Sequence, residues 1–483
     1  MSIASAFNSA GTGLTASARL AETVSNNVAN AMSPGYARRT TELSSLALAG
    51  FGTGVRVVGT YRAENVHVTA ERRLMQAAAA SAATIGEARD RALAATGEPG
   101  DPRALASRAT RLETAILRAV AEPSAYTALN QILDAAKDLA AGINSAAAEA
   151  DAMRKEADAE IARQVETLNR TLVQIDDLND RIKAAQARGL DTLSLEDERS
   201  RAIDRIAGIV PVRTVKRESG EIALFAANGG ALLDSRPWPL AFERSGDASN
   251  GLFQMRGGPD DPVAVPVGRG QGLMDGGSLS ALFEVRDTIA VEMMGELDRY
   301  ARDLIDRFAL QPPDGGMPAE ALGPGGEGLF LDPGDGTLGG LALRLTLNPA
   351  VDPARGGEIR RLRDGLDGTE RPEGFGVFLE AMADAMTMPR PPVAGLQSTG
   401  GANGSAGFAA EISSFMGGLA ARADENRAYL ASQSAILSER ETELLGVDTD
   451  AQLQYLMLVE QAYAANARVL SVVDQLLKRL LEI

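Results

Sequence analysis

Few side chains in this sequence could carry out chemistry. Its 483 residues include a single histidine, His67, and no cysteine. These two residue types supply most zinc ligands and all thiol nucleophiles, so both kinds of site are removed from consideration. His67 lies in a run of alternating residues, Asn65 to Val68, and is interpreted as a structural or surface residue. We therefore expect no metal site.

Two glycine-rich stretches invite comparison with ligand-binding loops. Residues 332–336 hold two aspartates, but the spacing and the distal glutamate of a calcium-binding loop are absent, so turn formation explains them better. Gly50, Gly52 and Gly54 precede a strand-like run. A dinucleotide-binding loop instead needs a sixth-position glycine, where this chain has Val55, and a helix after it. We expect no cofactor.

Carboxylates are the remaining route to catalysis. The chain has 65 Asp and Glu residues, and a glycosidase would need two of them paired across its substrate. Nothing in the sequence pairs any two, and at a net charge of -17 most acidic side chains are expected on the solvated surface. We expect no catalytic residues. A carbohydrate-cleaving enzyme that uses carboxylates of the outer β-rich domain predicted below is kept as the alternative to a structural protein.

Composition also limits partners and location. The acidic balance and the lack of Lys and Arg clusters argue against nucleic acid as a partner. No stretch is apolar for long enough to cross a membrane, and the amino terminus has neither the basic head nor the apolar core of a signal peptide. A cytoplasmic protein and a protein exported without a cleaved signal both fit, and the lack of thiols suits the second. The length suggests about three domains.

The last predicted helix, residues 452–483, carries a heptad repeat. A repeat of seven favours a left-handed coiled coil with another helix, and its one polar member, Asn466, would fix the register. An amphipathic helix that closes an ordinary globular bundle would show a similar stripe and is the alternative. The repeat consists of Leu456, Val459, Tyr463, Asn466, Leu470, Val473, Leu477 and Leu480.

A second heptad repeat at the other end of the chain favours the coiled coil. It is narrow and rich in small residues, with Gly11 and Gly13 inside it, so the helix should order only when packed. We interpret the ends as two mutually dependent helices, frayed or disordered in a free monomer and helical in an assembly. This repeat consists of Ile3, Phe7, Ala10, Leu14, Ser17, Ala21, Val24, Val28 and Ala31.

The sequence between the ends predicts long helices around a β-rich insert. A third heptad repeat runs from Ile161 to Ile182, and Ser194 with Asp197 has the spacing of a helix capping box. Period-two runs separated by Gly and Asn turns predict a small antiparallel sheet. Helices are predicted over 72–96, 103–121, 124–188, 194–208, 278–310, 374–387 and 407–445. Strands are predicted over 55–58, 210–216, 221–226, 231–234 and 341–347, with more to about 363, and a flexible linker over 389–407.

Motifs at both ends resemble those of bacterial flagellar axial proteins. The amino-terminal motif consists of Asn26, Asn27, Asn30, Pro34, Gly35 and Tyr36, followed by residues 54–57. The carboxy-terminal motif, residues 460–470, includes Gln461 and Arg468 and has Val459 before it where an aromatic residue is usual. The side-chain amides of Asn26, Asn27 and Asn30 can also be interpreted without the resemblance. They could satisfy free carbonyls at a helix end, or they could reach a neighbouring subunit.

Internal motifs narrow the resemblance to the hook-associated protein 1 family, the first junction protein between hook and filament. They are residues 193–199 followed by 209–212, residues 277–287, and residues 446–450. The chain departs from the family at 451–452 and at 290–293. Another axial protein, of the rod, the hook or the second junction, is the alternative, but rod and hook proteins have mostly β bodies. A surface adhesin would not need heptad repeats at both ends.

The resemblance implies an elongated, multi-domain and mainly α protein with an inserted β domain. Its terminal helices would form an inner coiled coil, surrounded by a bundle of long helices, with an antiparallel β domain outermost. The expected domains are 1–65 with 446–483 for the inner coiled coil, 66–208 with 277–311 and 370–445 for the bundle, and 209–276 with 312–369 for the outer β-rich domain.

The resemblance also implies a structural role without catalysis. The chain would polymerise on the hook tip through the two terminal heptad repeats and would be needed for filament assembly. Its expected partners are other copies of itself, the hook protein, the second junction protein and a cytoplasmic export chaperone on the carboxy-terminal helix, with neither nucleic acid nor membrane among them. The protein would leave the cell through the flagellar type III export apparatus.

Overall fold

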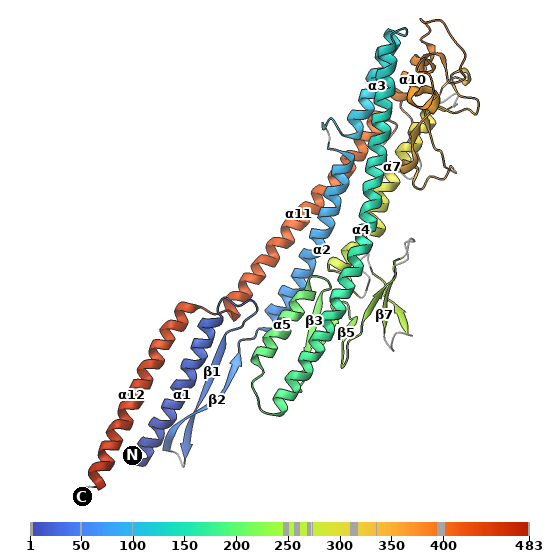
Figure 1. The fold of residues 1–483 in the computed structure, drawn as a ribbon. Coiled ribbons are helices and arrows are strands. Elements are labelled where there is room, and N and C mark those ends of the chain that lie inside the picture. The colour runs from blue at the N-terminus through green and yellow to red at the C-terminus, as the bar shows by residue number, and fades with distance from the viewer. Residues whose placement is uncertain are drawn as a thin grey trace.

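The computed structural model is an elongated molecule with both termini at the same end (Figure 1). Helices dominate and the strands form small antiparallel sheets, which confirms the predicted fold class. The structure describes residues 3–48, 51–98, 100–244, 251–255, 261–267, 272, 274–309, 317–334, 336–393 and 401–481.

The two ends of the chain fold together into what we call the terminal unit, residues 3–62 and 449–481. Helix α1 (Ile3–Asn30) packs along α12 (Thr449–Leu481), and both predicted terminal helices are present. A hairpin of β1 (Arg39–Leu48) and β2 (Phe51–Arg62) packs on α1 (Figure 1). The predicted strand 55–58 is the middle of β2. Strand β1 was not predicted because its Thr- and Ser-rich sequence lacks an alternating apolar pattern.

The remaining residues, 66–445, are called the body. Its axis is the 62-residue helix α4 (Tyr126–Ala187), whose apolar residues at helical spacing are buried along most of its length. The apolar members of the third heptad repeat, Ile161 to Ile182, are buried, as a helix packed lengthwise requires. The other long body helices are α2 (Val66–Thr96), α3 (Leu105–Ala121), α5 (Leu193–Ala207), α7 (Ala290–Arg307) and α11 (Ser405–Leu445), the last lying beside α2 (Figure 1).

Two three-stranded antiparallel sheets lie against α4 in the middle of the body. Asn179 of α4 accepts a hydrogen bond from the Ile222 N–H (3.2 Å) and donates to its carbonyl (2.9 Å). Asn169, ten residues earlier on the helix, does the same with Leu240 (2.9 and 2.7 Å) and so fixes the second sheet. The first sheet, predicted over 210–234, consists of β3 (Val212–Lys216), β4 (Ile222–Ala226) and β5 (Ala231–Leu233). The second consists of β6 (Leu240–Phe242), β7 (Leu252–Met255) and β8 (Pro262–Ala264).

The far end of the body departs from the prediction of further strands. The predicted strand 341–347 is wrong, because its first half is the helix α8 (Leu341–Arg344). Asp298 of α7 accepts hydrogen bonds from the N–H groups of Gly340 (2.8 Å) and Ala342 (2.7 Å), which favours a helix start at this point. The remaining elements are 3-10 turns at Ala319–Ala321, Pro349–Val351 and Pro353–Arg355, the short strands β9 (Phe330–Leu331) and β10 (Thr346–Leu347), and the helices α9 (Arg361–Asp364) and α10 (Val377–Thr387). Residues 312–369 are therefore not β-rich where the structure describes them.

One helix prediction is refined by the structure, and one helix-cap prediction is wrong. The long helix predicted over 278–310 is α6 (Ser278–Glu284) and α7 joined by a π-helical turn, Val285–Ile289. The predicted capping box of Ser194 with Asp197 is wrong. The N-cap residue of α5 is Thr192, and Asp197 accepts a hydrogen bond from Arg62. Of the predicted linker, 394–400 lies outside the described residues, and Arg390 pairs with Asn403 across it.

Candidate assembly interface

Asn27 is the polar centre of the terminal unit. This α1 residue is only 1% exposed. Its Nδ2 donates to the Arg39 carbonyl (2.8 Å) and to Oε1 of Gln452 (2.9 Å). Its Oδ1 accepts from the Tyr36 hydroxyl (3.0 Å) and from the Arg39 N–H (2.9 Å). Both amide donors and both acceptor positions are used, so Asn27 joins α1, the turn after it, β1 and the start of α12.

The turn after α1 has room for glycine alone at Gly35. The backbone there is left-handed, with φ of 74°, and an added Cβ would lie 2.4 Å from Cγ of Arg201 on α5. Next to it, the Arg39 guanidinium lies 5.1 Å from the centre of the Tyr36 ring. Burial raises the pKa of the Tyr36 hydroxyl, which keeps it protonated and able to donate to Asn27. These motif residues therefore hold the terminal unit together.

Helices α1 and α12 pack through small side chains. Gly13 of α1 faces Asn466 of α12 so closely that an added Cβ would lie 2.7 Å from Nδ2 of Asn466. The glycine thus admits the polar residue that was predicted to fix the register. The buried apolar residues of the two helices are Ala10, Ala16, Val24, Val459 and Val473. None is larger than valine, so the terminal unit has a thin core.

The residues of the two predicted heptad repeats differ in burial. Val24, Val459 and Val473 are buried, whereas Ile3, Leu14, Val28, Leu456, Asn466 and Leu470 are half-buried. Phe7, Tyr463 and Leu477 are 49%, 48% and 41% exposed, and the side chain of Leu480 lies outside the described residues. Packing of α1 on α12 therefore covers only part of the predicted interface.

A further row of apolar residues on α12 is exposed. It follows the spacing of three and four residues that marks one side of a coiled-coil helix, displaced by one residue from the predicted repeat. The large members are between 42% and 61% exposed. An apolar surface of this length on a helix is typical of a protein–protein contact. We call this row the outer seam: Tyr455, Leu458, Ala462, Ala465, Val469, Val472 and Leu476.

The remaining motif residues at the ends make fewer contacts. Asn30 donates through Nδ2 to the Asn26 carbonyl (2.9 Å), one turn earlier on α1. The side chains of Asn26, Pro34, Gln461 and Arg468 are exposed. They are available to a partner, in keeping with the interpretation of the amides as groups that reach a neighbouring subunit.

The internal motif 277–287 connects the β insert with helix α4, both within the body. Arg286 is 2% exposed and forms ion pairs with Asp158 of α4 (3.0 Å) and with Asp287 (2.7 Å). Its guanidinium also lies 5.8 Å from the ring centre of Phe242 in β6. At the start of the motif, a Cβ on Gly277 would lie 2.2 Å from the Ile209 carbonyl oxygen. The motif is explained by packing alone.

The sequence prediction missed several residues of this region. Gln452 is the α12 partner of Asn27. A glutamine in the first turns of a helix is usually solvent-exposed, so its residue type gives no signal of that role. The outer seam could have been found by starting the heptad count one residue earlier, at Tyr455. In the described part of the chain, no cluster of acidic or histidine side chains is suited to a metal ion, and no helix is long and apolar enough to span a membrane.

Comparison with known proteins gives a family match within the body. Residues 99–317 match the family model of the flagellar hook-associated protein FlgK helical domain. This stretch, from α3 to α7 with the β insert, is similar to the helical domain of that family. Over these residues the match confirms the resemblance to the hook-associated protein 1 family. The motifs at both ends lie outside the matched residues.

A solved structure also matches part of the chain. The flagellar hook junction protein FlgK from Burkholderia pseudomallei has 19% sequence identity to this chain, and the TM-score is 0.46. The alignment covers 54% of this chain and 46% of that one, so the chain spans less than half the length of this relative. A search of curated protein sequences finds no match.

Proposed function

We propose that this chain is a structural subunit of the bacterial flagellum that polymerises on the hook tip and adapts the hook to the filament. The outer seam of α12 is the observation that carries the proposal. It is an exposed helix face with coiled-coil spacing, in a chain whose helical domain matches the FlgK family. Other copies of the chain are its expected occupant, because an axial assembly repeats one contact between identical subunits.

The weak core of the terminal unit supports the same proposal. Buried apolar residues no larger than valine stabilise two long helices poorly, so contacts with other subunits are expected to add to their stability. The Asn27 contacts fasten α12 only near its start, at Gln452. We therefore expect fraying in a free monomer to be confined to the outer ends of the helices, and order throughout the assembled terminal unit.

Partners other than the chain itself belong to the same proposal. The hook protein would lie below the ring of subunits and the second junction protein above it. Before export by the type III apparatus, a cytoplasmic chaperone would cover the outer seam, because an amphipathic helix with an exposed apolar face is a common recognition element. Nucleic acid is not among the proposed partners, because the chain has a net charge of -17 and nucleic acid is itself negatively charged.

Complementation of a strain that lacks the gene tests the proposal. Deletion should leave hooks without filaments and flagellin in the medium, and the wild-type gene should restore filaments. Val472→Asp places a charge on the outer seam, where the native side chain is 53% exposed, and should not restore filaments. Val173→Asp, at a 60% exposed valine of α4, is the matched control and should restore them. Electron microscopy and an assay of secreted flagellin provide the measurements.

Two outcomes would contradict the proposal. Normal filaments with Val472→Asp would show that the outer seam is not an assembly contact. Missing hooks in the deletion strain would identify the chain as a rod or hook component instead of a junction protein. Wild-type levels of the variant in the medium would establish that it is still exported.

A further inference from the structure

The terminal unit and the body share no apolar core in the part of the chain that the structure describes. The continuous core of the body begins at Ala88 of α2 and ends at Met416 of α11. The buried apolar residues of the terminal unit and of the turn within it, which are Ala10, Ala16, Val24, Ala37, Val459 and Val473, are not part of it. Because apolar burial is the main force that fixes one unit against another, their relative orientation depends on weaker contacts.

The chain crosses between the two units at two short links. Residues 63–65 join β2 to α2, and residues 446–448 join α11 to α12. The links lie side by side, since the Arg38 N–H donates to the Leu445 carbonyl (2.8 Å) and the Ala63 N–H to the Arg38 carbonyl (2.7 Å). An open cleft of about 1070 Å³ lies beside them, between the turn after α1 and the ends of α2, α5 and α11. Two adjacent links beside an open cleft are the geometry of a hinge.

We call the region of the two links the joint. The contacts that span it, between the terminal unit and the body, are polar and centre on Asp197 of α5. This carboxylate is 4% exposed and accepts from Arg62 Nε of β2 at 2.6 Å. Arg39 Nη2 of β1 lies 3.6 Å from its other oxygen and donates to Ser194 Oγ at 3.0 Å. We call Asp197, Arg39 and Arg62 the clasp.

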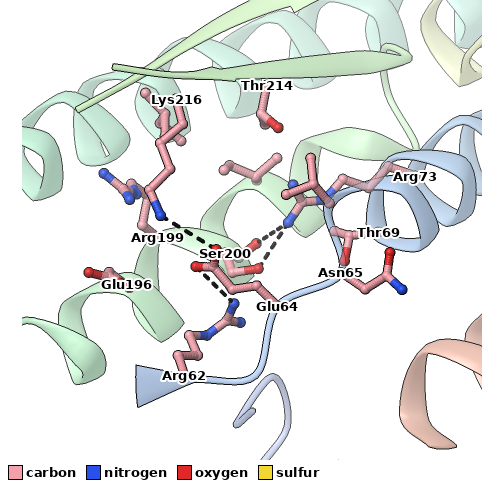
Figure 2. A pocket seen from close by; sticks show the side chains of 13 residues that line it. Arg62, Glu64, Asn65, Thr69, Arg73, Glu196, Arg199, Ser200, Thr214 and Lys216 are labelled. Atoms are coloured by element: carbon pink, nitrogen blue, oxygen red, sulfur yellow. Dashed lines mark hydrogen bonds and ion pairs between the residues drawn. The ribbon is translucent and has the colours of Figure 1, made fainter. Parts of the chain in front are cut away.

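A small cavity of about 130 Å³ lies next to the clasp (Figure 2). Glu64, in the first link, lies between Arg62 (4.0 Å) and Lys216 of β3 (3.4 Å). On the other side of the joint, Arg201 of α5 donates to the Pro34 carbonyl (3.3 Å). The contacts of Glu64 with Lys216 and of Arg201 with Pro34 therefore connect the terminal unit or its link to β3 and α5, and both are polar.

We propose that the joint is a hinge between the terminal unit and the body and that the clasp holds it at one angle. Arg39 and Arg62 are partners in the β1–β2 hairpin, so both belong to the terminal unit, and Asp197 binds them from the body. Removal of the Asp197 carboxylate would therefore take away the attraction that holds the two units at one angle and leave two largely buried cations without their anion. The apolar contacts inside each unit would be unaffected. The hinge is a property of the single chain and does not depend on the proposed function. In a junction between hook and filament, it would let the terminal units keep one packing while the bodies adopt another angle.

Pulsed electron paramagnetic resonance on the full chain tests the hinge. The chain has no cysteine, so introduced cysteines carry the spin labels alone. The pair Ser45→Cys and Ser432→Cys, at exposed positions of β1 and α11, spans the joint. The pair Ser45→Cys and Gln454→Cys, both exposed, reports on the terminal unit itself. In the Asp197→Asn background, the distance distribution of the first pair should broaden and shift, and that of the second pair should not change.

Asp204→Asn provides the matched control. Asp204 lies on the same helix and also accepts from two arginines, Arg72 (2.5 Å) and Arg73 (2.8 Å), but both belong to the body. Its loss should change neither distribution. The hinge is contradicted if Asp197→Asn leaves the spanning distribution as narrow as in the parent chain, or if Asp204→Asn broadens it equally. A broad distribution for the second pair in the parent chain would also overturn the proposal, because a hinge needs a folded terminal unit.

Discussion

The same heptad pattern has opposite outcomes in α4 and α12. In α4 the apolar positions, such as Leu168 and Leu172, are fully buried against other parts of the body. In α12 only Val459 and Val473 are buried among the described residues, and Leu458, Val472 and Leu476 are exposed. Heptad spacing therefore shows that a helix needs a partner, but not whether the partner belongs to the same chain. The body buries its heptad positions within the single chain, whereas α12 leaves most of its apolar positions at least partly exposed.

The largest difference between the two regions should appear on truncation of a leucine in each. Leu168→Ala removes a fully buried side chain and should lower the free energy of unfolding of the body by about 2–5 kcal/mol. Leu477→Ala removes one that is 41% exposed and should change the stability of the free chain by no more than about 0.5 kcal/mol. Urea denaturation followed by circular dichroism gives both values. Equal losses would show that α12 is already packed in the free chain.

A smaller and local effect is expected at the polar centre of the terminal unit. Asn27→Ala removes four hydrogen bonds and leaves Gln452 and Tyr36 without their partner, which should cost about 1–3 kcal/mol in that unit alone. Asn26→Ala, at its exposed neighbour, should cost little. Amide exchange measured by mass spectrometry should be faster in the hairpin and at the start of α12 for the first variant only, with α4 unchanged. Faster exchange in α4 would mean that the two units are not independent.

The smallest effect concerns a half-buried carboxyl of the body. Burial raises the pKa of Glu284 above its ordinary 4.5, opposed by Arg89 and reinforced by Asp275 and Glu292. The folded body therefore binds this proton more tightly than the unfolded chain does, and its stability falls as pH rises from the ordinary pKa through the raised one. Glu284→Gln should be more stable than the parent chain at pH 7, with an advantage that disappears as the pH is lowered toward the ordinary pKa.

Thermal denaturation over this pH range measures the effect of Glu284→Gln. Glu443→Gln, at an exposed residue near the end of α11, is the control and should follow the parent chain at every pH. A constant advantage of Glu284→Gln across the range would assign its effect to packing and not to ionisation.

Much of the fold could be predicted from local pattern, and the failures share a cause. The helices and the first sheet have periodic sequences, so their presence follows from the spacing of apolar residues. The segment 341–347 alternates like a strand, but Asp298, more than forty residues earlier, binds the N–H groups at the start of α8. An acceptor so distant in sequence leaves no local signal.

The candidate interface shows the same limit. The heptad positions of α1 and α12 could be named from spacing, and Asn27 and Tyr36 from their motif. The roles of Gln452 and Asp197 depend on contacts with Asn27, Arg39 and Arg62, which lie far away in the sequence. Which of the apolar residues of α12 are covered within one chain is likewise a property of packing, not of pattern.

Hydrogen exchange of the full chain, free and bound to isolated hooks, tests most directly the claim that α12 is completed by a partner. In the free chain, the amides of α4 should be protected and those of 469–481, beyond the Asn27 contacts, should exchange rapidly. On hooks, the same residues should become protected while α4 is unchanged. Strong protection of 469–481 in the free chain, or no gain in protection on hooks, would contradict the claim.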